Sequence, residues 1–312
     1  TRREPRILMY HRFDTDGTPP GVPAAVFREQ LRMLRSEFLV VTLAELAERL
    51  TAGAVEPNLA VITVDDGYED FYRVAYPILR EEGVPATFFV TTGFVDRELW
   101  LWPDAIEYLL ARTPVRSPDL HGYGVSGPVD TTTANGRAAV WGQLVNFFLD
   151  LTSSVRLEKL RELALALETP WRAVPDEEHK PCTWDNIREM SRNGIEIGAH
   201  TVTHPRLPLE SDQALADEIR GSKERLEEQI DREVSSFCYP NGAPPDYDDR
   251  VAEAVRSAGF RCAVVAHFDG GRGDLYRLRR LGVGNDMFQY RKSIAGVEHV
   301  GRRWLNRGLA AT

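Results

Sequence analysis

Residues 60–68, Ala-Val-Ile-Thr-Val-Asp-Asp-Gly-Tyr, constrain the fold most, because an apolar β-branched run ends there in two adjacent carboxylates and a glycine. Such a run predicts a strand buried on both faces, as in a parallel sheet covered by helices. Asp65 and Asp66 then lie at the rim of that sheet, where two like charges repel unless one is neutralised. A divalent cation would neutralise one carboxylate and leave the other free as a base. The alternative is structural, since an aspartate after a strand also caps helices.

A second polar segment follows another short β-type run within residues 194–205, and it contains His200 and His204. Two histidines four residues apart can face the same ion, and imidazole with carboxylate suits zinc or a neighbouring transition metal. One aspartate and two histidines leave coordination positions for water and substrate, as in a catalytic metal site. A histidine pair on its own is equally compatible with an ordinary surface.

These segments resemble the motifs of the polysaccharide deacetylase (NodB-homology) family of metal-dependent carbohydrate esterases. Residues 63–67, Thr-Val-Asp-Asp-Gly, resemble its first motif, and residues 200–204, His-Thr-Val-Thr-His, its second. Residues 237–242, Phe-Cys-Tyr-Pro-Asn-Gly, resemble its third motif, and residues 7–11 resemble the strand that begins many bacterial members. The resemblance covers most of the chain in the right order, apart from residues 98–181.

The resemblance implies a role for each matching residue. Asp66, His200 and His204 would bind one divalent ion, expected to be zinc, with cobalt or nickel as alternatives. Asp65 would be the base that takes a proton from water, because a bound cation acidifies water and polarises the acetamide carbonyl. The backbone N–H of Asn241 would help to stabilise the oxyanion of the tetrahedral intermediate.

The third and late motifs depart from the family pattern. Cys238 occupies the position of the arginine that holds the base in many members, so Asp65 lacks that support. No Leu-x-His motif is present to supply the histidine that protonates the leaving amine. His267, which follows an apolar run, is the favoured substitute, and His11 after the first strand is the rival.

Strands and helices alternate through most of the chain, which predicts a parallel barrel or a doubly wound sheet. The family resemblance selects the irregular (β/α)7 barrel, an α/β fold, within a single catalytic domain over residues 1–312. The predicted strands cover residues 6–10, 60–64, 86–90, 195–199, 234–239, 260–265 and 276–283. The predicted helices cover residues 23–37, 43–50, 69–82, 184–193, 211–230 and 247–258, before a basic tail at 291–307.

Residues 98–181 interrupt this alternation with helical patterns and no predicted strand, which indicates a helical insertion over the mouth of the barrel. Trp100 and Trp102 in this insertion could stack on sugar rings, or they could anchor it to the core. Arg280 could support the site. The predicted substrate contacts are Tyr68, Trp100, Trp102, Tyr239 and Arg280.

Composition limits the partners. The net charge of −9 over 312 residues argues against nucleic acid or an anionic membrane. The three cysteines have no CxxC spacing, and no apolar run is long enough to span a membrane. The resemblance favours the cell envelope or secretion, but the first residue is Thr rather than Met, so export and a cytoplasmic location both stay open. The sequence does not indicate an oligomeric state.

The sequence therefore predicts a metal-dependent hydrolase that removes N-acetyl groups from N-acetylhexosamine units of a glycan. Two alternatives stay open at this point. One is hydrolysis of another amide C–N bond, and the other is a glycan-binding protein that keeps the metal with weak or no catalysis.

Overall fold

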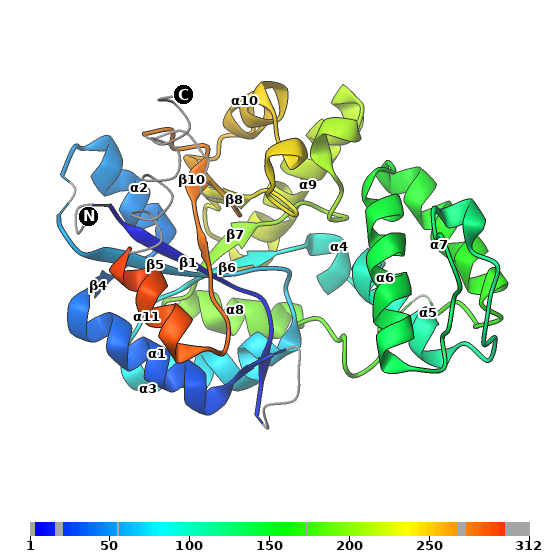
Figure 1. Cartoon of the computed structure of the whole chain (residues 1–312). Helices are drawn as coiled ribbons and strands as arrows, with labels where there is room; N and C mark the ends of the chain where they lie inside the picture. Colours follow the sequence, from blue (N-terminus) through cyan, green and yellow to red (C-terminus); the bar gives the residue numbers. More distant parts are fainter. Residues whose placement is uncertain (1–3, 16–20, 55, 173, 267–272, 297–312) are drawn as a thin grey trace, which may run out of the picture.

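A parallel β-barrel forms the centre of the molecule in the computed structural model (Figure 1). The structure describes residues 4–15, 21–54, 56–172, 174–266 and 273–296. The strands are hydrogen-bonded in the order β10-β9-β8-β7-β6-β5-β1-β11, and each neighbouring pair is parallel. They are β1 (Arg6–Tyr10), β5 (Leu59–Val64), β6 (Thr87–Val90), β7 (Glu196–Ala199), β8 (Ser236–Cys238), β9 (Cys262–Val265), β10 (Leu278–Arg279) and β11 (Leu281–Gly282).

One chain segment nearly closes the barrel, since β10 and β11 are separated by Arg280 alone. β10 pairs with β9 on one side, and β11 pairs with β1 on the other. Because two of the eight strands in the path belong to this segment, the barrel has seven strand positions. The predicted (β/α)7 barrel is confirmed, while the single last strand predicted over residues 276–283 is corrected to two short strands interrupted at Arg280.

The central strand β5 is buried along its whole length and ends at the polar rim of the barrel. All six of its residues are buried, as expected for a strand covered on both faces. Val61 belongs to an interior apolar cluster with Phe89. Because side chains alternate along a strand, Thr63 and Asp65 follow Val61 on the interior side. The Arg280 guanidinium bonds both of them, which places this arginine inside the barrel.

Helices surround the barrel and connect its strands (Figure 1). They are α1 (Ala24–Glu37), α2 (Leu43–Thr51), α3 (Tyr76–Glu82), α4 (Thr92–Val95), α8 (Trp184–Arg192), α9 (Asp212–Ile230), α10 (Asp249–Ser257) and α11 (Met287–Ala295). Short strands β2 (Phe13–Asp14), β3 (Val22–Pro23) and β4 (Leu39–Val40) complete this part. Within the described ranges, no helix has the length and apolar character that a membrane span requires.

Two helical regions differ from the prediction. The helix predicted over residues 69–82 is divided into a π-helix, Phe71–Ala75, and α3, which has Pro77 in its first turn. Proline lacks an N–H group, so the regular helical bond ladder is interrupted before it. α11 was not predicted and runs into the start of the basic tail expected over 291–307; its signals are a cap by Asp286 and a left-handed Gly296 at its end.

The helices of residues 98–181 pack against one another beside the barrel (Figure 1). Their bounds are α5 (Trp102–Arg112), α6 (Ala134–Leu149) and α7 (Ser153–Ala166). They share a hydrophobic cluster of their own, in which Leu109, Leu144, Phe148 and Leu163 are fully buried. The assignment of residues 98–181 as an insertion within one domain stays a prediction.

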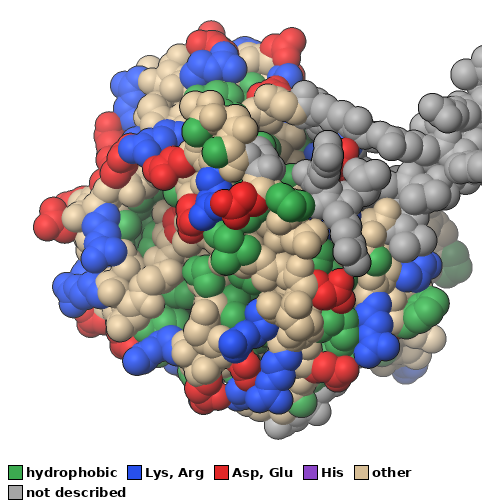
Figure 2. Space-filling view, turned by 90° about the vertical axis from the view of Figure 1, so that its left-hand side faces the viewer, with side chains coloured by type: hydrophobic (Ala, Val, Ile, Leu, Met, Phe, Trp, Pro, Cys, Tyr) green, Lys and Arg blue, Asp and Glu red, His purple; other side chains and the backbone are tan. Residues whose placement is uncertain are grey.

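The face toward α2 and β4 carries charged side chains of both signs, interspersed around apolar ones (Figure 2). A cavity of about 540 Å³ is lined by Ile7 at the start of β1, by Leu46 and Leu50 of α2, and by Leu278. These residues lie at the amino-terminal end of the barrel strands, whereas reactive groups in parallel barrels collect at the carboxyl ends. The carboxyl ends of the strands are therefore where reactive groups are expected.

Candidate active site

Polar side chains follow the carboxyl ends of β5, β7 and β8, and the backbone there is unusual. Asp66, Thr201, His204 and Asn241 have φ values of 83°, 65°, 56° and 60°, in the left-handed region that residues other than glycine seldom occupy. Such conformations persist where the surrounding structure holds them, and they gather at functional sites. These four residues therefore mark the rim of the barrel as the candidate active site.

Asp66, His200 and His204 come together although more than 130 residues of sequence separate the aspartate from the histidines. Oδ1 of Asp66 lies 3.5 Å from Nε2 of His200 and 3.6 Å from Nε2 of His204. Two ligand atoms about 2.1 Å from one tetrahedral ion lie about 3.4 Å apart, so these separations fit a shared ion. The three groups could hold a divalent metal, as predicted from the sequence.

The two histidines present one nitrogen each to Asp66. His200 Nδ1 lies 2.8 Å from the carbonyl oxygen of Cys238, and this bond leaves Nε2 as the free ligand atom. His204 is buried, and its Nδ1 has no hydrogen-bond partner among the described residues. Burial, followed by the neighbouring His200, lowers the pKa of His204 to about 3. The imidazole of His204 is therefore neutral at physiological pH, as a metal ligand must be.

The loop between the histidines is held from several sides. Glu218 of α9 accepts hydrogen bonds from the backbone N–H groups of Val202 and Thr203, both at 2.8 Å. Thr201 Oγ1 accepts from the N–H of His204 at 3.0 Å. At the other edge, the N–H of Gly93 donates to the Val202 carbonyl at 3.0 Å. Glu218 was not identified from the sequence, because a glutamate on an amphipathic helix gives no signal of its backbone partners.

Asp65 lies beside this group and is held by Arg280. Arg280 Nη1 donates to Oδ1 at 2.6 Å, and Nη2 donates to Oδ2 at 2.7 Å. Burial raises the pKa of Asp65, but the charge and hydrogen bonds of Arg280 outweigh it, so the pKa of this carboxyl is lowered overall. Arg280 is itself 1% exposed and faces the carboxylate, in keeping with the expectation that it could support the site, while its predicted contact with substrate stays a prediction.

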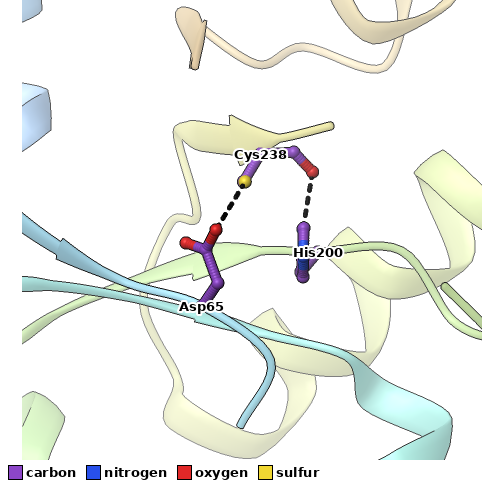
Figure 3. A group of neighbouring side chains, drawn as sticks. All are labelled: Asp65, His200 and Cys238. Atoms are coloured by element: carbon purple, nitrogen blue, oxygen red, sulfur yellow. Dashed lines mark hydrogen bonds between the residues drawn. The ribbon is translucent and has the colours of Figure 1, made fainter. Parts of the chain in front are cut away.

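Cys238 contacts both Asp65 and His200 (Figure 3). Its Sγ lies 3.6 Å from Asp65 Oδ2 and 3.1 Å from Arg280 Nη2, while its carbonyl contacts His200. Burial raises the pKa of the thiol, so it stays protonated. Asp65 Oδ2 thus contacts both the Cys238 thiol and the Arg280 guanidinium.

The two candidate acids are placed differently. Nε2 of His11 lies 3.7 Å from Asp65 Oδ2, and its side chain is 48% exposed, so it borders the site and is open to solvent. His267 lies outside the described residues. Asn241 is exposed and left-handed in the turn after β8, and its predicted oxyanion role stays a prediction.

The four aromatic residues predicted to contact substrate are buried, and their substrate contacts stay predictions. Trp100 is 6% exposed and donates from Nε1 to the Arg172 carbonyl, while Trp102 is 4% exposed in the cluster of α5–α7. Tyr239 is fully buried, and its hydroxyl donates to the Tyr276 carbonyl. Aromatic side chains supply core packing as well as binding surfaces, and sequence alone did not separate the two roles.

Tyr68 links the Asp65–Asp66 turn to α5. Its ring is 5% exposed, and its hydroxyl donates to Asp104 Oδ2 at 2.6 Å. Burial raises the pKa of Asp104 to about 6, although nearby His179 acts in the opposite direction. Asp104, Glu107 and His179 also form a group whose ligand atoms lie within 4.8 Å of one another. Tyr68 therefore joins the Asp65–Asp66 turn to α5, and its predicted substrate contact stays a prediction.

A parallel barrel with two histidines and one aspartate around a common point, beside a carboxylate held as an anion, defines a metal-site hydrolase architecture. The family model for polysaccharide deacetylases matches residues 52–126 and 147–263. The chain belongs to the polysaccharide deacetylase family, as the sequence motifs predicted. Carbohydrate esterases of this family depend on a metal and act on glycans, and the Asp66 group is one that could bind the ion.

Individual relatives are distant. YxkH of Bacillus subtilis, named for the same family, is 21% identical over 285 residues, covering 90% of this chain and 72% of that protein. The Streptococcus pyogenes deacetylase PplD, in complex with acetate, has a TM-score of 0.60 at 20% identity and covers 92% of this chain and 95% of its own. A de-N-acetylase of Aggregatibacter actinomycetemcomitans has a TM-score of 0.58 at 16% identity, covering 93% and 99%. At these identities the two structures show a shared fold.

Proposed function

We propose that the protein is a metal-dependent N-deacetylase that removes acetyl groups from N-acetylhexosamine units of a glycan. The observation that carries this proposal is the placement of Asp66 Oδ1 at 3.5 and 3.6 Å from the two histidine Nε2 atoms. Asp65, the next residue along the chain, supplies a second carboxylate that is not needed as a ligand. Membership of the family and the fold shared with a named de-N-acetylase support the same reaction.

Asp66, His200 and His204 would hold the ion, which we propose to be zinc, since two imidazoles and one carboxylate are a common zinc ligand set. Cobalt and nickel accept the same donors. When bound, the ion supplies Lewis-acid chemistry, polarising the acetamide carbonyl and lowering the pKa of water.

Asp65 acts as the general base in this proposal. Its lowered pKa keeps it ionised at neutral pH, and Arg280 fixes the plane of its carboxylate. Asp65 takes a proton from the attacking water, and the C–N bond breaks when a proton reaches the amine nitrogen. His11 is the described residue placed to supply that proton, because it is half-exposed and 3.7 Å from Asp65. His267 remains the competing candidate.

The alternative of a glycan-binding protein without efficient catalysis drew support from Cys238 at the usual arginine position and from the missing Leu-x-His motif. The contact between Arg280 and Asp65 answers the first point, because Asp65 has an arginine partner from the segment between β10 and β11, and the His11 and His267 variants test the second. Hydrolysis of a different amide remains a question of substrate, and the same residues would serve it.

Acetate release from N-acetylated oligosaccharides, measured with the zinc-loaded protein, tests the proposal. We expect release that stops on addition of a chelator, returns with zinc, and falls by about 10³-fold or more in Asp65→Asn, which keeps the shape of the base but cannot take a proton. Binding of the oligosaccharide with no acetate release by the zinc-loaded wild type would contradict it.

A further inference from the structure

Arg156, in the first turns of α7, is buried among backbone carbonyl groups. It is 3% exposed, and it donates from Nε to the Phe148 carbonyl at 3.0 Å and from Nη2 to the Leu151 carbonyl at 2.8 Å. The acceptor of the third bond lies outside α5–α7: Nη1 donates to the carbonyl oxygen of His204 at 3.3 Å. One guanidinium thus joins the turn between α6 and α7 to a residue of the candidate metal group.

The charge of Arg156 has no carboxylate at ion-pair distance within the described part of the chain. Burial lowers the pKa of Arg156 to about 10, and Glu210 and Glu218 act on it only from a distance. The guanidinium also lies over the Trp102 ring, 4.8 Å from its centroid. Burying an arginine this way is unfavourable unless its donors are used. The three carbonyl bonds are therefore what fixes the guanidinium in this place.

Two further contacts hold the same turn against the segment that follows His204. The N–H of Ser153 donates to Glu210 Oε1 at 2.7 Å. Asp150 forms an ion pair with Arg206. Residues 150–156, which form the α6–α7 turn and the start of α7, are thus bonded to residues 204–210 at three points. Arg156 makes the contact to His204 itself.

Different parts of the chain make the hydrogen bonds on the two sides of His204. On its amino-terminal side, Thr201 bonds its N–H, and Glu218 bonds the two preceding N–H groups. On its carbonyl side, Arg156 is the bonding group. His204 has a φ of 56°, a conformation that a β-substituted residue leaves unless its neighbours hold it. Loss of the carbonyl bond would let the residue rotate toward ordinary φ values and carry Nε2 away from Asp66.

We propose that Arg156 is a positioning residue, by which the helical segment α5–α7 holds His204 in the conformation that metal binding needs. The proposal rests on the proposed function only in taking His204 as a metal ligand. It gives residues 98–181 a role in the chemistry even though Trp100 and Trp102 are buried.

Three variants test the proposal. Arg156→Ala removes all three bonds, and Arg156→Lys keeps a charge but cannot span three carbonyl groups. Leu163→Ala is the matched control, because Leu163 is fully buried in the α5–α7 cluster and its loss destabilises that cluster without removing a contact to His204. Zinc affinity is measured by competition with a chromogenic chelator. Hydrogen exchange of residues 201–206 is measured in the metal-free protein.

We expect Arg156→Ala to weaken zinc binding by about 10- to 100-fold, as loss of groups behind metal ligands generally does. Hydrogen exchange of the backbone amides in residues 201–206 should accelerate by roughly fivefold or more, because local opening of this loop becomes easier when the bond to the His204 carbonyl is lost. Arg156→Lys should lie between wild type and Ala, and Leu163→Ala should change zinc affinity less than about twofold while lowering the melting temperature. The visible spectrum of the cobalt-substituted protein should change in Arg156→Ala and stay as in wild type in Leu163→Ala.

A folded Arg156→Ala with wild-type zinc affinity and wild-type exchange would overturn the proposal, and so would equal losses in Leu163→Ala. If Arg156→Ala does not fold, Arg156→Lys decides by the same readouts. If the wild type binds zinc tightly but releases no acetate, the proposed function fails while the role of Arg156 still stands or falls on these measurements. If the wild type binds no zinc, exchange in the metal-free protein decides.

Discussion

Arg280 donates two hydrogen bonds to Asp65, from Nη1 to Oδ1 at 2.6 Å and from Nη2 to Oδ2 at 2.7 Å. Bidentate pairs of this kind fix orientation as well as charge. The arginine comes from the segment that closes the barrel, whereas many family members place an arginine at the position of Cys238. Cys238 Sγ lies 3.1 Å from Arg280 Nη2, so the two positions face the same carboxylate.

Arg280→Ala should therefore damage catalysis through the base. Without the guanidinium, burial is the dominant influence on Asp65 and raises its pKa, so the ionised fraction falls at mildly acidic pH. We expect kcat to fall by about 10²-fold or more, and the acidic limb of kcat/KM to move to higher pH. The pH profile from 4 to 9 checks this. An unchanged limb with a uniform loss at every pH would contradict the assigned role.

Because residues 238 and 280 contact the same carboxylate, an arginine at residue 238 should restore activity lost in Arg280→Ala. Cys238 Sγ lies 3.6 Å from Asp65 Oδ2, so in Cys238→Arg combined with Arg280→Ala we expect the new guanidinium to contact the same carboxylate. We expect the double variant to recover about tenfold or more of the activity lost in Arg280→Ala. Cys238→Ala with Arg280→Ala is the control, because it supplies no new charge. Equal activity of the two double variants would count against an interchange of the two arginine positions.

His11 and His267 are distinguished by replacing each with alanine. If His11 protonates the leaving amine, His11→Ala should lose about 10²-fold in turnover while its zinc content stays equal to wild type. Zinc content measured alongside acetate release separates this from damage to the metal group. A loss in His267→Ala with none in His11→Ala would assign the acid to His267 instead.

The strands were predictable because each is a short apolar run that ends in polar residues, as β5 shows with Asp65 and Asp66. Those runs and the family motifs together placed the metal group. Arg280 was harder, since an arginine between two-residue strands shows no sign that it points inward. Burial of Trp100 and Trp102 depended on how α5–α7 pack, which period and composition do not determine.

Removal of the metal should lower stability as well as activity. An ion that binds only the folded state stabilises it by RT ln(1 + [L]/Kd), which is about 2.7 kcal/mol when the free ion is 100 times Kd. We expect the melting temperature of wild type to rise on zinc addition, and His204→Ala to lose most of that rise. His121→Ala, which changes an exposed histidine away from the group, should keep it. A rise of the same size in His204→Ala would show that the ion binds elsewhere.

Asp104 gives a prediction about stability and pH. Burial raises its folded-state pKa to about 6, above the unfolded value of 3.8. The folded state therefore binds this proton more tightly, so the contribution to stability is present below the unfolded pKa and is lost as pH rises through about 6. At pH 8 the ionised carboxylate should destabilise the fold by up to about 3 kcal/mol, since each pKa unit corresponds to about 1.4 kcal/mol.

Asp104→Asn keeps an oxygen that can accept the Tyr68 hydroxyl and removes the buried charge. We expect this variant to melt at a higher temperature than wild type at pH 8, with the difference shrinking toward zero by about pH 4. Asp217→Asn is the control, because Asp217 is exposed and also accepts a side-chain hydrogen bond, from Gln213. Its melting temperature should follow wild type across the pH range. A lower melting temperature for Asp104→Asn at pH 8 would mean that the ionised carboxylate stabilises the contact between α5 and the Asp65–Asp66 turn.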